Sequence, residues 1–378
     1  MKKVRILALH LSYGGVEKAI VSIANLLAER YEVEILSVYR MPGPVAFPLD
    51  PRVRVRYLLR DVPNREAWKA SLRERAPLRF VRESFRAVRI LLEKKWAVYR
   101  AIRSARDGVF LSTRHEDNLM LSRFGAPGVL KIAQLHHDHR FERRYVRAFA
   151  RRYGGLDCLV MLTPGLADEV RRMMPAKSRT RVTAIPNFLE HYPEAPSPDG
   201  RKQRILSVGR LDTVKGFDRL LRSFSELHAQ RPGWQLRIVG EGAERPRLER
   251  MIQELGLADA VTLTGRLDAP GVEREMLEAS VYAMCSHSEG FGFVLAEAQS
   301  CALPLVAYDV RVGPAYLIGE GEDGFLIPDG DEEGFTAALL RLTDDEALRR
   351  RMAVRARERS FRFSKEEVAG MWYSVIGE

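Results

Sequence analysis

The chain has 378 residues, of which 46% are hydrophobic and 29% charged, and it carries a formal net charge of +11. This composition is typical of globular proteins and excludes wholesale disorder, a collagen-like repeat and a low-complexity fibre. The length predicts two domains, each with its own core. Apolar stretches such as residues 20–28 end well before the ~20 residues that a membrane-spanning helix needs.

The first residues, MKKVRILALHLSYGG, have a charged start but no long apolar region and no small-residue cleavage site. We therefore expect a strand here and not a signal peptide. Cys158, Cys285 and Cys301 lie far apart and form no CxxC pair, which argues against a disulfide framework or a zinc cluster. These features favour a protein of the reducing cytoplasm.

The two halves of the chain differ in charge. Residues 1–195 hold 37 basic and 20 acidic side chains, a net charge of +17, whereas the remainder has a net charge of −6. A basic half of this kind is typical of proteins that meet a membrane surface, a polyanionic substrate or nucleic acid. The alternative is that the protein comes from an arginine-rich proteome. The positive charge would then reflect general amino-acid usage and not a binding partner.

The N-terminal half begins with the pattern of a parallel α/β domain. Residues 4–9 predict a strand, glycines follow, residues 16–30 predict a helix, and residues 33–38 predict the next strand. Further strands are expected at 109–112, 129–134, 159–162 and 181–185.

Basic charge is concentrated in residues 65–106, which hold 13 basic and 4 acidic side chains. Apolar residues recur there every three or four positions and predict one face of a helix, namely Leu78, Val81, Phe85, Val88 and Leu92. Beside that face lie Arg79, Arg82, Arg86 and Arg89. Such a helix is suited to the headgroup region of an anionic bilayer or to a polyanion. The alternative is an apolar face that belongs to the core, with solvated arginines.

The pattern restarts after a proline-rich segment, HYPEAPSPDG at 191–200, which predicts an interdomain linker. Strands are then expected at 204–208, 235–239, 261–264, 281–285 and 305–308, and helices at 217–229, 245–255, 273–279 and 293–301. A last amphipathic helix, residues 363–376, is expected to return to the first domain.

The predicted fold class is therefore α/β, with two Rossmann-like domains that face each other across a cleft. The expected bounds are 1–192 for the first domain, 203–362 for the second, and 363–378 for the returning helix. Ligands of such sheets bind at the carboxyl ends of the strands.

Three motifs follow predicted strands. Gly14–Gly15 stand between a strand and a helix, where a backbone without Cβ can approach an anion, although many such turns are purely structural. In SVGRLDTVKGFD (207–218), Arg210 and Lys215 suit a diphosphate, or are solvated loop cations. In SHSEGFGFVLAEA (286–298), Glu289 precedes a glycine-rich turn and Glu297 lies in the following helix.

Together these motifs resemble the retaining glycosyltransferases of family 4, which have the GT-B fold of two Rossmann-like domains. The resemblance covers nearly the whole chain. It rests on Gly14–Gly15, GRLDTVKGFDRLL (209–221), IVGEGAERPRL (238–248), SEGFGFVLAEA (288–298) and GFLIPDGD (324–331). Glu289 and Glu297, which are separated by seven intervening residues, are its strongest part.

The resemblance implies a UDP-sugar donor held mainly by the second domain. Arg210 and Lys215 would hold the diphosphate, Glu297 the ribose and Glu289 the sugar. Cations on a leaving diphosphate act electrostatically, so no divalent metal and no other cofactor is expected. The implied donor-binding set also includes Gly14, Gly15, Gly209, Gly240, Arg266, Gly290, Phe291, Gly292 and Phe293.

A histidine completes the implied catalytic set of Glu289, Arg210 and Lys215. QLHHDHR (134–140) follows a predicted strand, and the resemblance places a histidine here near the transferred sugar. We expect His136 in this role, with His139 second. A structural histidine is one alternative. A metal site of these neighbouring residues is another, but side chains of adjacent residues do not all point to one ion.

One departure from the family pattern concerns the acceptor. Many members have Gly-Gly after the strand that follows the second glutamate, whereas this chain has YDVRVGPAYLI at 308–318. That version looks like the branch that glucosylates or N-acetylglucosaminylates teichoic acids and other bacterial surface polymers. The basic N-terminal half fits such a polyanion, or the inner face of the plasma membrane where it is assembled.

We therefore expect a metal-independent retaining glycosyltransferase that moves a hexose to a surface glycan, a lipid-linked intermediate or a teichoic-type polymer. One alternative is a nucleotide-sugar epimerase on the same fold, which fits Glu289, Glu297, Arg210 and Lys215 less well. The other is a non-enzymatic basic protein that binds a membrane or a polyanion. No RNA-binding signature or zinc finger appears, so nucleic acid is not an expected partner.

Overall fold

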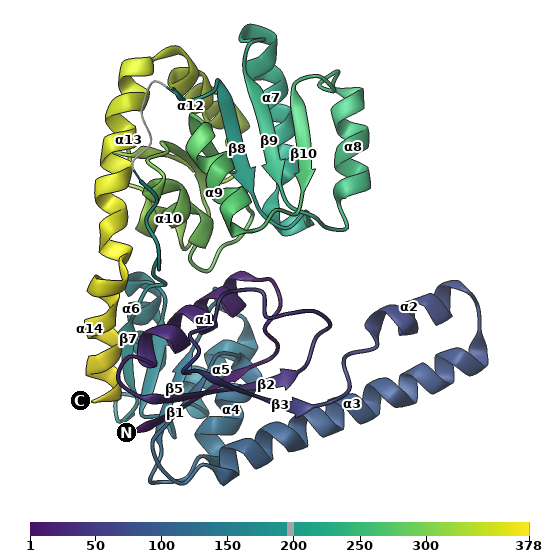
Figure 1. Ribbon diagram of the computed structural model, residues 1–378, viewed down its shortest axis with the longest axis vertical. Helices are drawn as coiled ribbons and strands as arrows, with labels where there is room; N and C mark the ends of the chain where they lie inside the picture. Colours follow the sequence, from purple (N-terminus) through teal and green to yellow (C-terminus); the bar gives the residue numbers. More distant parts are fainter. Residues whose placement is uncertain (195–199, 378) are drawn as a thin grey trace. The chain divides into compact units, whose positions relative to one another are not determined.

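The computed structural model describes residues 1–194 and 200–377, and it divides into two compact units (Figure 1). Unit 1 comprises Met1–Ile185 together with the C-terminal residues from Ala369, and unit 2 comprises Pro186–Val368. Residues 186–192 and 363–368 therefore belong to unit 2. Residues 195–199 of the predicted linker lie outside the described residues.

Unit 1 is built on a seven-stranded parallel sheet with the order β3-β2-β1-β4-β5-β6-β7. Its strands are β1 (Lys3–Ala8), β2 (Glu32–Tyr39), β3 (Arg54–Leu59), β4 (Val109–Ser112), β5 (Leu130–Gln134), β6 (Cys158–Met161) and β7 (Arg181–Ala184). All but β3 were predicted. β3 is an edge strand without a fully buried residue, so its apolar signal is weak.

The helices of unit 1 connect these strands. They are α1 (Gly15–Leu27), α4 (His115–Phe124), α5 (Arg143–Arg151) and α6 (Pro164–Met173), besides the two described next. The last helix of the chain, α14 (Lys365–Ile376), belongs to unit 1 from Ala369 onward. The hydroxyl of Tyr373 in α14 donates to the carbonyl of Leu26 in α1, at 3.3 Å. Lys2 Nζ donates to the carbonyl of Ile376 at 2.8 Å. These contacts confirm the predicted return of the C-terminal helix to the first domain.

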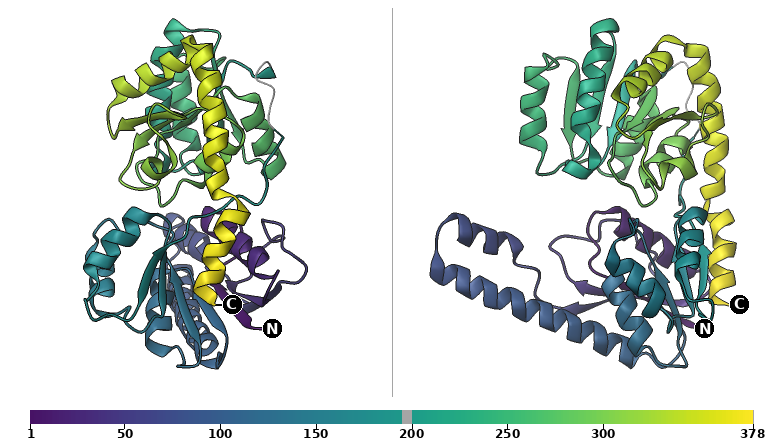
Figure 2. Two further views of the ribbon diagram at one scale, coloured as in Figure 1. Left: turned by 90° about the vertical axis from the view of Figure 1, so that its left-hand side faces the viewer. Right: turned by 180° about the vertical axis from the view of Figure 1, so that it is seen from behind.

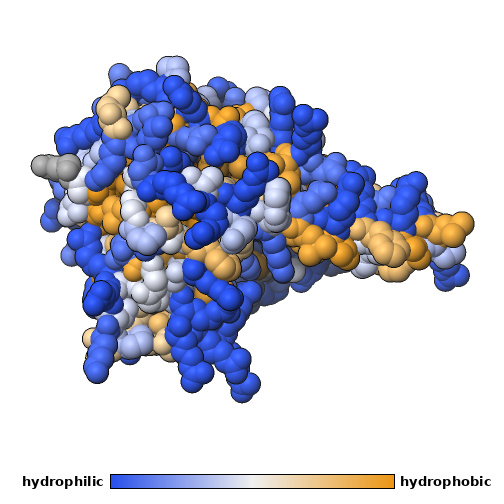
Figure 3. Space-filling view, turned by 90° about the horizontal axis from the view of Figure 1, so that it is seen from below, coloured by the Kyte–Doolittle hydropathy of each residue, from blue (hydrophilic) through white to orange (hydrophobic). Residues whose placement is uncertain are grey.

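Helices α2 (Arg65–Arg73) and α3 (Pro77–Ser104) form a hairpin between β3 and β4. Figure 2 shows that this hairpin extends beyond the sheet of unit 1, and Figure 3 shows hydrophobic side chains along it. The Trp68 ring lies 5.6 Å from the Phe80 ring, and Trp68 Nε1 donates to Ser84 Oγ at 3.0 Å. Within residues 1–194 and 200–377, no helix is both long and apolar enough to cross a bilayer.

Unit 2 is built on a six-stranded parallel sheet with the order β10-β9-β8-β11-β12-β13. Its strands are β8 (Arg204–Val208), β9 (Gln235–Val239), β10 (Val261–Gly265), β11 (Val281–Met284), β12 (Leu305–Asp309) and β13 (Gly324–Pro328). All but β13 were predicted as strands.

The helices of unit 2 include the four that were predicted. The set is α7 (Phe217–Gln230), α8 (Arg245–Glu254), α9 (Ala269–Glu278), α10 (Phe293–Ser300), α11 (Pro314–Leu317), α12 (Glu332–Asp344) and α13 (Glu346–Ser360), with short 3₁₀ turns η2 (Thr213–Lys215) and η3 (Phe361–Phe363). α9 begins four residues earlier than predicted, because the Asp268 carboxylate accepts a bond from the Gly271 amide and caps the helix there.

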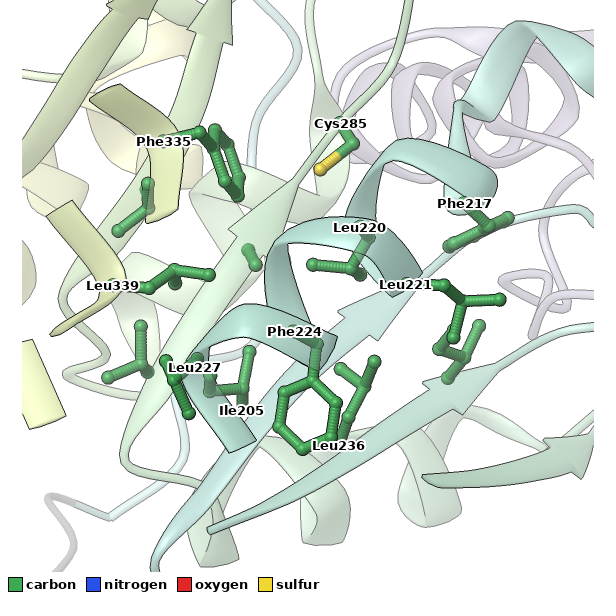
Figure 4. Close-up of a cluster of buried hydrophobic side chains, with 14 of the residues drawn as sticks. Ile205, Phe217, Leu220, Leu221, Phe224, Leu227, Leu236, Cys285, Phe335 and Leu339 are labelled. Carbon is green, nitrogen blue, oxygen red and sulfur yellow. The ribbon is translucent and has the colours of Figure 1, made fainter. Parts of the chain in front are cut away.

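The core of unit 2 lies between α7 and the sheet (Figure 4). Apolar residues of α7 recur at helical spacing and are buried, so one face of the helix packs on the strands. Phe224, Leu220 and Ile205 are completely buried. Each such side chain contributes about 1.5–3 kcal/mol by leaving water. This packing holds the start of α7, and the loop before it, against the carboxyl end of the sheet.

Candidate active site

The strand order of unit 2 places two predicted motifs side by side. The chain adds strands on one side of β8 and then on the other, starting with β11, so β8 and β11 flank a topological switch point. Ligands of open α/β sheets bind beyond the carboxyl ends of the strands at such points. The loop after β8 carries Arg210 and Lys215, and the loop after β11 carries Glu289.

Lys215 and Glu289 meet at this point. Lys215 Nζ donates to Glu289 Oε1 at 2.6 Å, although the residues are 74 positions apart in the chain. The Ser286 hydroxyl donates to the same oxygen, also at 2.6 Å. The Glu289 side chain is only 11% exposed. Within the described part of the chain, Glu289 Oε2 accepts no hydrogen bond, so one carboxylate oxygen is anchored while the other can accept from a ligand hydroxyl.

A buried arginine that the sequence analysis missed joins the two loops. Arg219 in α7 donates to the carbonyls of Cys285 at 2.6 Å and Ser286 at 3.0 Å, and to Asp329 Oδ1 at 2.6 Å. Its guanidinium lies 4.2 Å from the centre of the Tyr308 ring. Arg219 therefore fixes the loop after β11 relative to α7. Asp218 and Arg222 are charged side chains of the same helix. The sequence therefore has no signal that distinguishes Arg219 from its charged neighbours.

Arg210 is arranged differently from Lys215. Its side chain is 77% exposed, and its Nε donates to Asp212 Oδ2 at 2.6 Å. Arg266 follows β10 and is also exposed. The two cations expected to hold a diphosphate therefore differ in exposure: each pairs with a carboxylate, but the Lys215 side chain is 24% exposed and that of Arg210 is 77% exposed.

The glycines after β8 and β9 allow their loops to approach closely. A Cβ on Gly240 would lie 1.8 Å from the carbonyl oxygen of Gly209, and the φ of Gly240 is 153°. The Leu211 amide donates to the carbonyl of Glu241 at 3.1 Å. Only glycine fits at position 240, so this predicted residue shapes the backbone of the site.

The turn at 290–293 leads directly into α10. Gly292 has a φ of 85° and precedes the first residue of the helix. Phe291 is buried, with its ring 5.5 Å from that of Phe363, whereas Gly290 and Phe293 are half-buried. The Phe291 side chain therefore packs in the core of unit 2. Only the backbone of this residue is available to bind a nucleotide-sugar donor.

Glu297 lies half-buried in α10, the helix into which the turn after Glu289 leads. Burial raises the pKa of the Tyr282 phenol, and the negative charges of Glu297 and Glu289 raise it further. The Tyr282 hydroxyl lies 3.3 Å from both the amide and the carbonyl of Val208. Tyr282 thus ties the end of β8 to β11, a role that its position in a buried strand did not reveal.

The Gly-Pro departure noted in the sequence contacts the Glu289 turn. Gly313 has a φ of 89° and precedes α11. A Cβ on Gly313 would lie 2.7 Å from the carbonyl oxygen of Phe291 and 3.3 Å from the Cβ of Glu289. The residue therefore contributes to the position of Glu289, which the sequence comparison alone did not suggest.

In unit 1, Gly14 lies between β1 and α1, whereas Gly15 is the first residue of α1, one position earlier than the predicted start of that helix. A Cβ on Gly14 would lie 2.1 Å from Glu17 Oε2, whereas one on Gly15 would meet no atom within 4 Å. Glu17 is buried, and its Oε1 lies 3.5 Å from Nδ1 of His10. The backbone of Gly14 therefore closely approaches the Glu17 carboxylate, which belongs to the first turn of α1.

His136 follows β5 and is buried, and its Nε2 has no hydrogen-bond partner among the described residues. Burial, assisted by the positive charges of His137 and Arg114, lowers the pKa of His136 to about 3. The imidazole is therefore neutral at physiological pH. An unpaired polar atom in a buried position costs about 1–3 kcal/mol, which favours a ligand partner for it.

The neighbouring histidines differ from His136. The Nε2 of His139 lies 3.2 Å from Glu169 Oε2, and its Nδ1 accepts from the Phe141 amide at 3.1 Å. His137 is exposed, and Asp138 Oδ1 accepts from the Arg140 amide at 3.0 Å. Within residues 1–194 and 200–377, no three His, Cys, Asp or Glu side chains are grouped as metal ligands.

Each of the four arginines predicted to meet a membrane or polyanion lies near an acidic side chain. Arg79 pairs with Glu74, Arg82 with Glu83, and Arg86 and Arg89 both approach Asp61. Their charge is therefore partly balanced by acidic side chains of the hairpin and of the segment that precedes it.

Comparisons with known proteins agree with this architecture. Residues 190–359 match the family model of glycosyl transferases group 1. The chain superimposes over its whole length on Staphylococcus aureus TarM, whose structure contains fondaparinux, α-GlcNAc-glycerol and UDP. The TM-score is 0.77 at 14% identity, covering 100% of both chains. The chain therefore has the GT-B fold, and its second half carries a glycosyl transferases group 1 domain.

Two relatives have names that refer to surface polysaccharides. An exopolysaccharide phosphotransferase of Streptomyces coelicolor is 31% identical over 97% of this chain, which spans only 39% of that relative. A lipopolysaccharide core biosynthesis glycosyltransferase of Rhizobium meliloti is 27% identical, and the alignment covers 96% of this chain and 96% of that relative.

Proposed function

We propose that this chain is a retaining glycosyltransferase that moves a hexose, glucose or N-acetylglucosamine being favoured, from a UDP-sugar to a bacterial surface glycan. The acceptor is lipid-linked or a teichoic-type polyanion. The reaction takes place in the cytoplasm at the inner face of the plasma membrane. The observation that carries the proposal is the Lys215–Glu289 pair at the switch point between β8 and β11, within the segment that matches the family model.

The chemistry follows from these two side chains. Lys215 Nζ has three donors, of which one is directed to Glu289, so the ammonium can also bond to a phosphate oxygen. Lys215 and Arg210 then stabilise the negative charge that develops on the departing UDP. Because these cations supply positive charge to the diphosphate, the proposed reaction does not need a divalent metal or another cofactor.

Other residues of the proposed site orient the reactants. Glu289 Oε2 accepts from a sugar hydroxyl, and Glu297 from the ribose diol. By the resemblance to family 4, Gly14 or Gly15 would bind the phosphates, and a neutral His136 would bind the transferred sugar. These roles, and the retaining outcome, rest on the resemblance to family 4.

The proposed acceptor class is supported by the relatives. Both named relatives act on surface polysaccharides according to their names, and the TarM structure holds α-GlcNAc-glycerol with UDP. The charge of +17 in residues 1–195 suits a polyanionic acceptor or an anionic membrane.

Thermal-shift measurements with nucleotides and nucleotide sugars test the donor. A ligand that binds the native state raises the melting temperature by mass action. We expect UDP and one UDP-sugar to raise it, with the same shift in the presence of EDTA. Lys215→Ala should remove most of the shift and reduce transfer by about 100-fold or more, the usual loss for one electrostatic contact in a transition state.

Lys202→Ala is the matched control. Lys202 pairs with Glu278 at the same 2.6 Å distance as Lys215 with Glu289, but it precedes β8 and so lies at the opposite end of the sheet. This variant should bind UDP like the wild type. Equal shifts for the two variants, or no shift of the wild type with any nucleotide, would contradict the proposal.

A further inference from the structure

Helix α3 has two apolar faces, of which the protein covers one. The inner face carries Ile90 and Val98, which are buried, and Phe80, which packs on Trp68 of α2. The outer face, here called the α3 stripe, is exposed; it consists of Leu78, Val81, Phe85, Val88, Leu92, Trp96 and Tyr99. Leu78 is 87% exposed, Phe85 74% and Trp96 60%. The apolar face that the sequence predicted is therefore not part of the core.

The α3 stripe is continuous. Its residues are separated by three or four positions, so they align along one side of the helix. From Leu78 to Tyr99 they extend over about 32 Å at 1.5 Å per residue. Figure 3 shows hydrophobic side chains along the protruding hairpin, with hydrophilic ones beside them. An exposed apolar surface of this length indicates a binding partner.

Positive charge borders the α3 stripe. Residues 65–104 contain 12 basic and 4 acidic side chains, a net charge of +8. Of the acidic ones on α3, Glu83 is buried and Glu93 lies 3.7 Å from Arg89. Lys95 and Arg103 form no ion pair with any described residue, and the Arg100 guanidinium lies over the Trp96 ring at 5.0 Å.

This charge distinguishes between two kinds of partner. A second copy of the chain would place another charge of +8 opposite the first, without a row of acidic residues to pair with it, which is destabilising. An anionic bilayer complements the charge, and its interface accommodates mixed aliphatic, Trp and Tyr side chains next to Lys and Arg.

We propose that the α3 stripe docks on the surface of an anionic bilayer. Its apolar side chains enter the headgroup and acyl boundary, while Lys95, Arg100 and Arg103 contact lipid phosphates. This inference deepens the proposed function by naming the surface that brings the enzyme to a membrane acceptor. It does not depend on the identity of the donor.

Trp96 provides a direct signal for docking. Among the four tryptophans, Trp234 and Trp372 are buried and Trp68 packs against Phe80, so Trp96 is the exposed indole. When the full chain is mixed with phosphatidylglycerol-containing vesicles, tryptophan emission should move to shorter wavelength. Phosphatidylcholine vesicles should produce a much smaller change. Trp96→Phe should abolish the spectral change while the chain still sediments with the vesicles.

Substitution of the α3 stripe tests the contact itself. Phe85→Ser combined with Leu92→Ser should weaken sedimentation with anionic vesicles at least tenfold, about 1.4 kcal/mol. The control is Val354→Ser combined with Met371→Ser, which replaces two exposed apolar residues of α13 and α14. The control variant should bind vesicles like the wild type. Lys95→Glu combined with Arg100→Glu should remove the preference for anionic lipid.

Three outcomes would overturn this inference. They are a wild type that does not sediment with anionic vesicles, a stripe variant that sediments normally, and a vesicle-free wild-type dimer that the stripe substitutions convert to a monomer. Light scattering during size-exclusion chromatography measures the last. The UDP thermal shift of each variant separates the two proposals, because stripe substitutions should leave the shift unchanged.

Discussion

The buried neutral state of His136 leads to a quantitative prediction about stability. Burial lowers the pKa of His136 to about 3 in the folded chain, whereas the unfolded chain has the ordinary value of ~6.5. The unfolded state therefore binds a proton between these values and the folded state does not. The stability associated with the neutral imidazole is complete above the ordinary pKa and is lost as the pH falls toward 3.

The magnitude follows from the two pKa values. Between about pH 7 and about pH 5, His136 should destabilise the folded chain by about 2 kcal/mol, since each pH unit below the unfolded pKa contributes about 1.4 kcal/mol. His136→Gln keeps a polar side chain but cannot titrate. The difference in unfolding free energy between variant and wild type should therefore change by about 2 kcal/mol in favour of the variant over this range.

Urea unfolding followed by circular dichroism at several pH values measures this difference. His191→Gln is the control, because the His191 side chain is 70% exposed and is not among the charges that lower the pKa of His136. That variant should keep the pH dependence of the wild type. Parallel pH profiles for His136→Gln and the wild type would refute a buried neutral His136, and with it the proposed hydrogen bond of its imidazole to a sugar.

Two further predictions concern single residues. Gly313→Ala places a Cβ 2.7 Å from the Phe291 carbonyl at a φ of 89°, so it should destabilise unit 2 by about 1–3 kcal/mol and weaken UDP-sugar binding by displacing Glu289. Gly256→Ala, at a φ of 68° with no atom near the new Cβ, should cost stability in urea titrations without changing the affinity; equal affinity losses would contradict this reasoning. Burial raises the pKa of Asp117 to about 6, so ionisation destabilises the fold as the pH rises through this value. Asp117→Asn should therefore increase stability by up to about 3 kcal/mol at about pH 7 and by about half as much at about pH 5, and a pH-independent gain would contradict it.

The sequence determined the local architecture because buried parallel strands and amphipathic helices have strong periodic signals. All eleven strands that were predicted lie within one residue of their observed bounds. β3 was not predicted, because an edge strand buries little apolar surface. α3 was predicted as an amphipathic helix, but a helical period does not show which of two apolar faces a protein covers.

The residue types of the candidate site were also determined by the sequence, since Arg210, Lys215, Glu289 and Glu297 lie in recognisable motifs. Their arrangement was not. The Lys215–Glu289 contact depends on β8 and β11 being neighbours, which only the order of strands in the sheet decides. The supporting contacts of Arg219 and Gly313 also join segments distant in the chain. Such contacts depend on packing in three dimensions, and packing has no period that a single sequence displays.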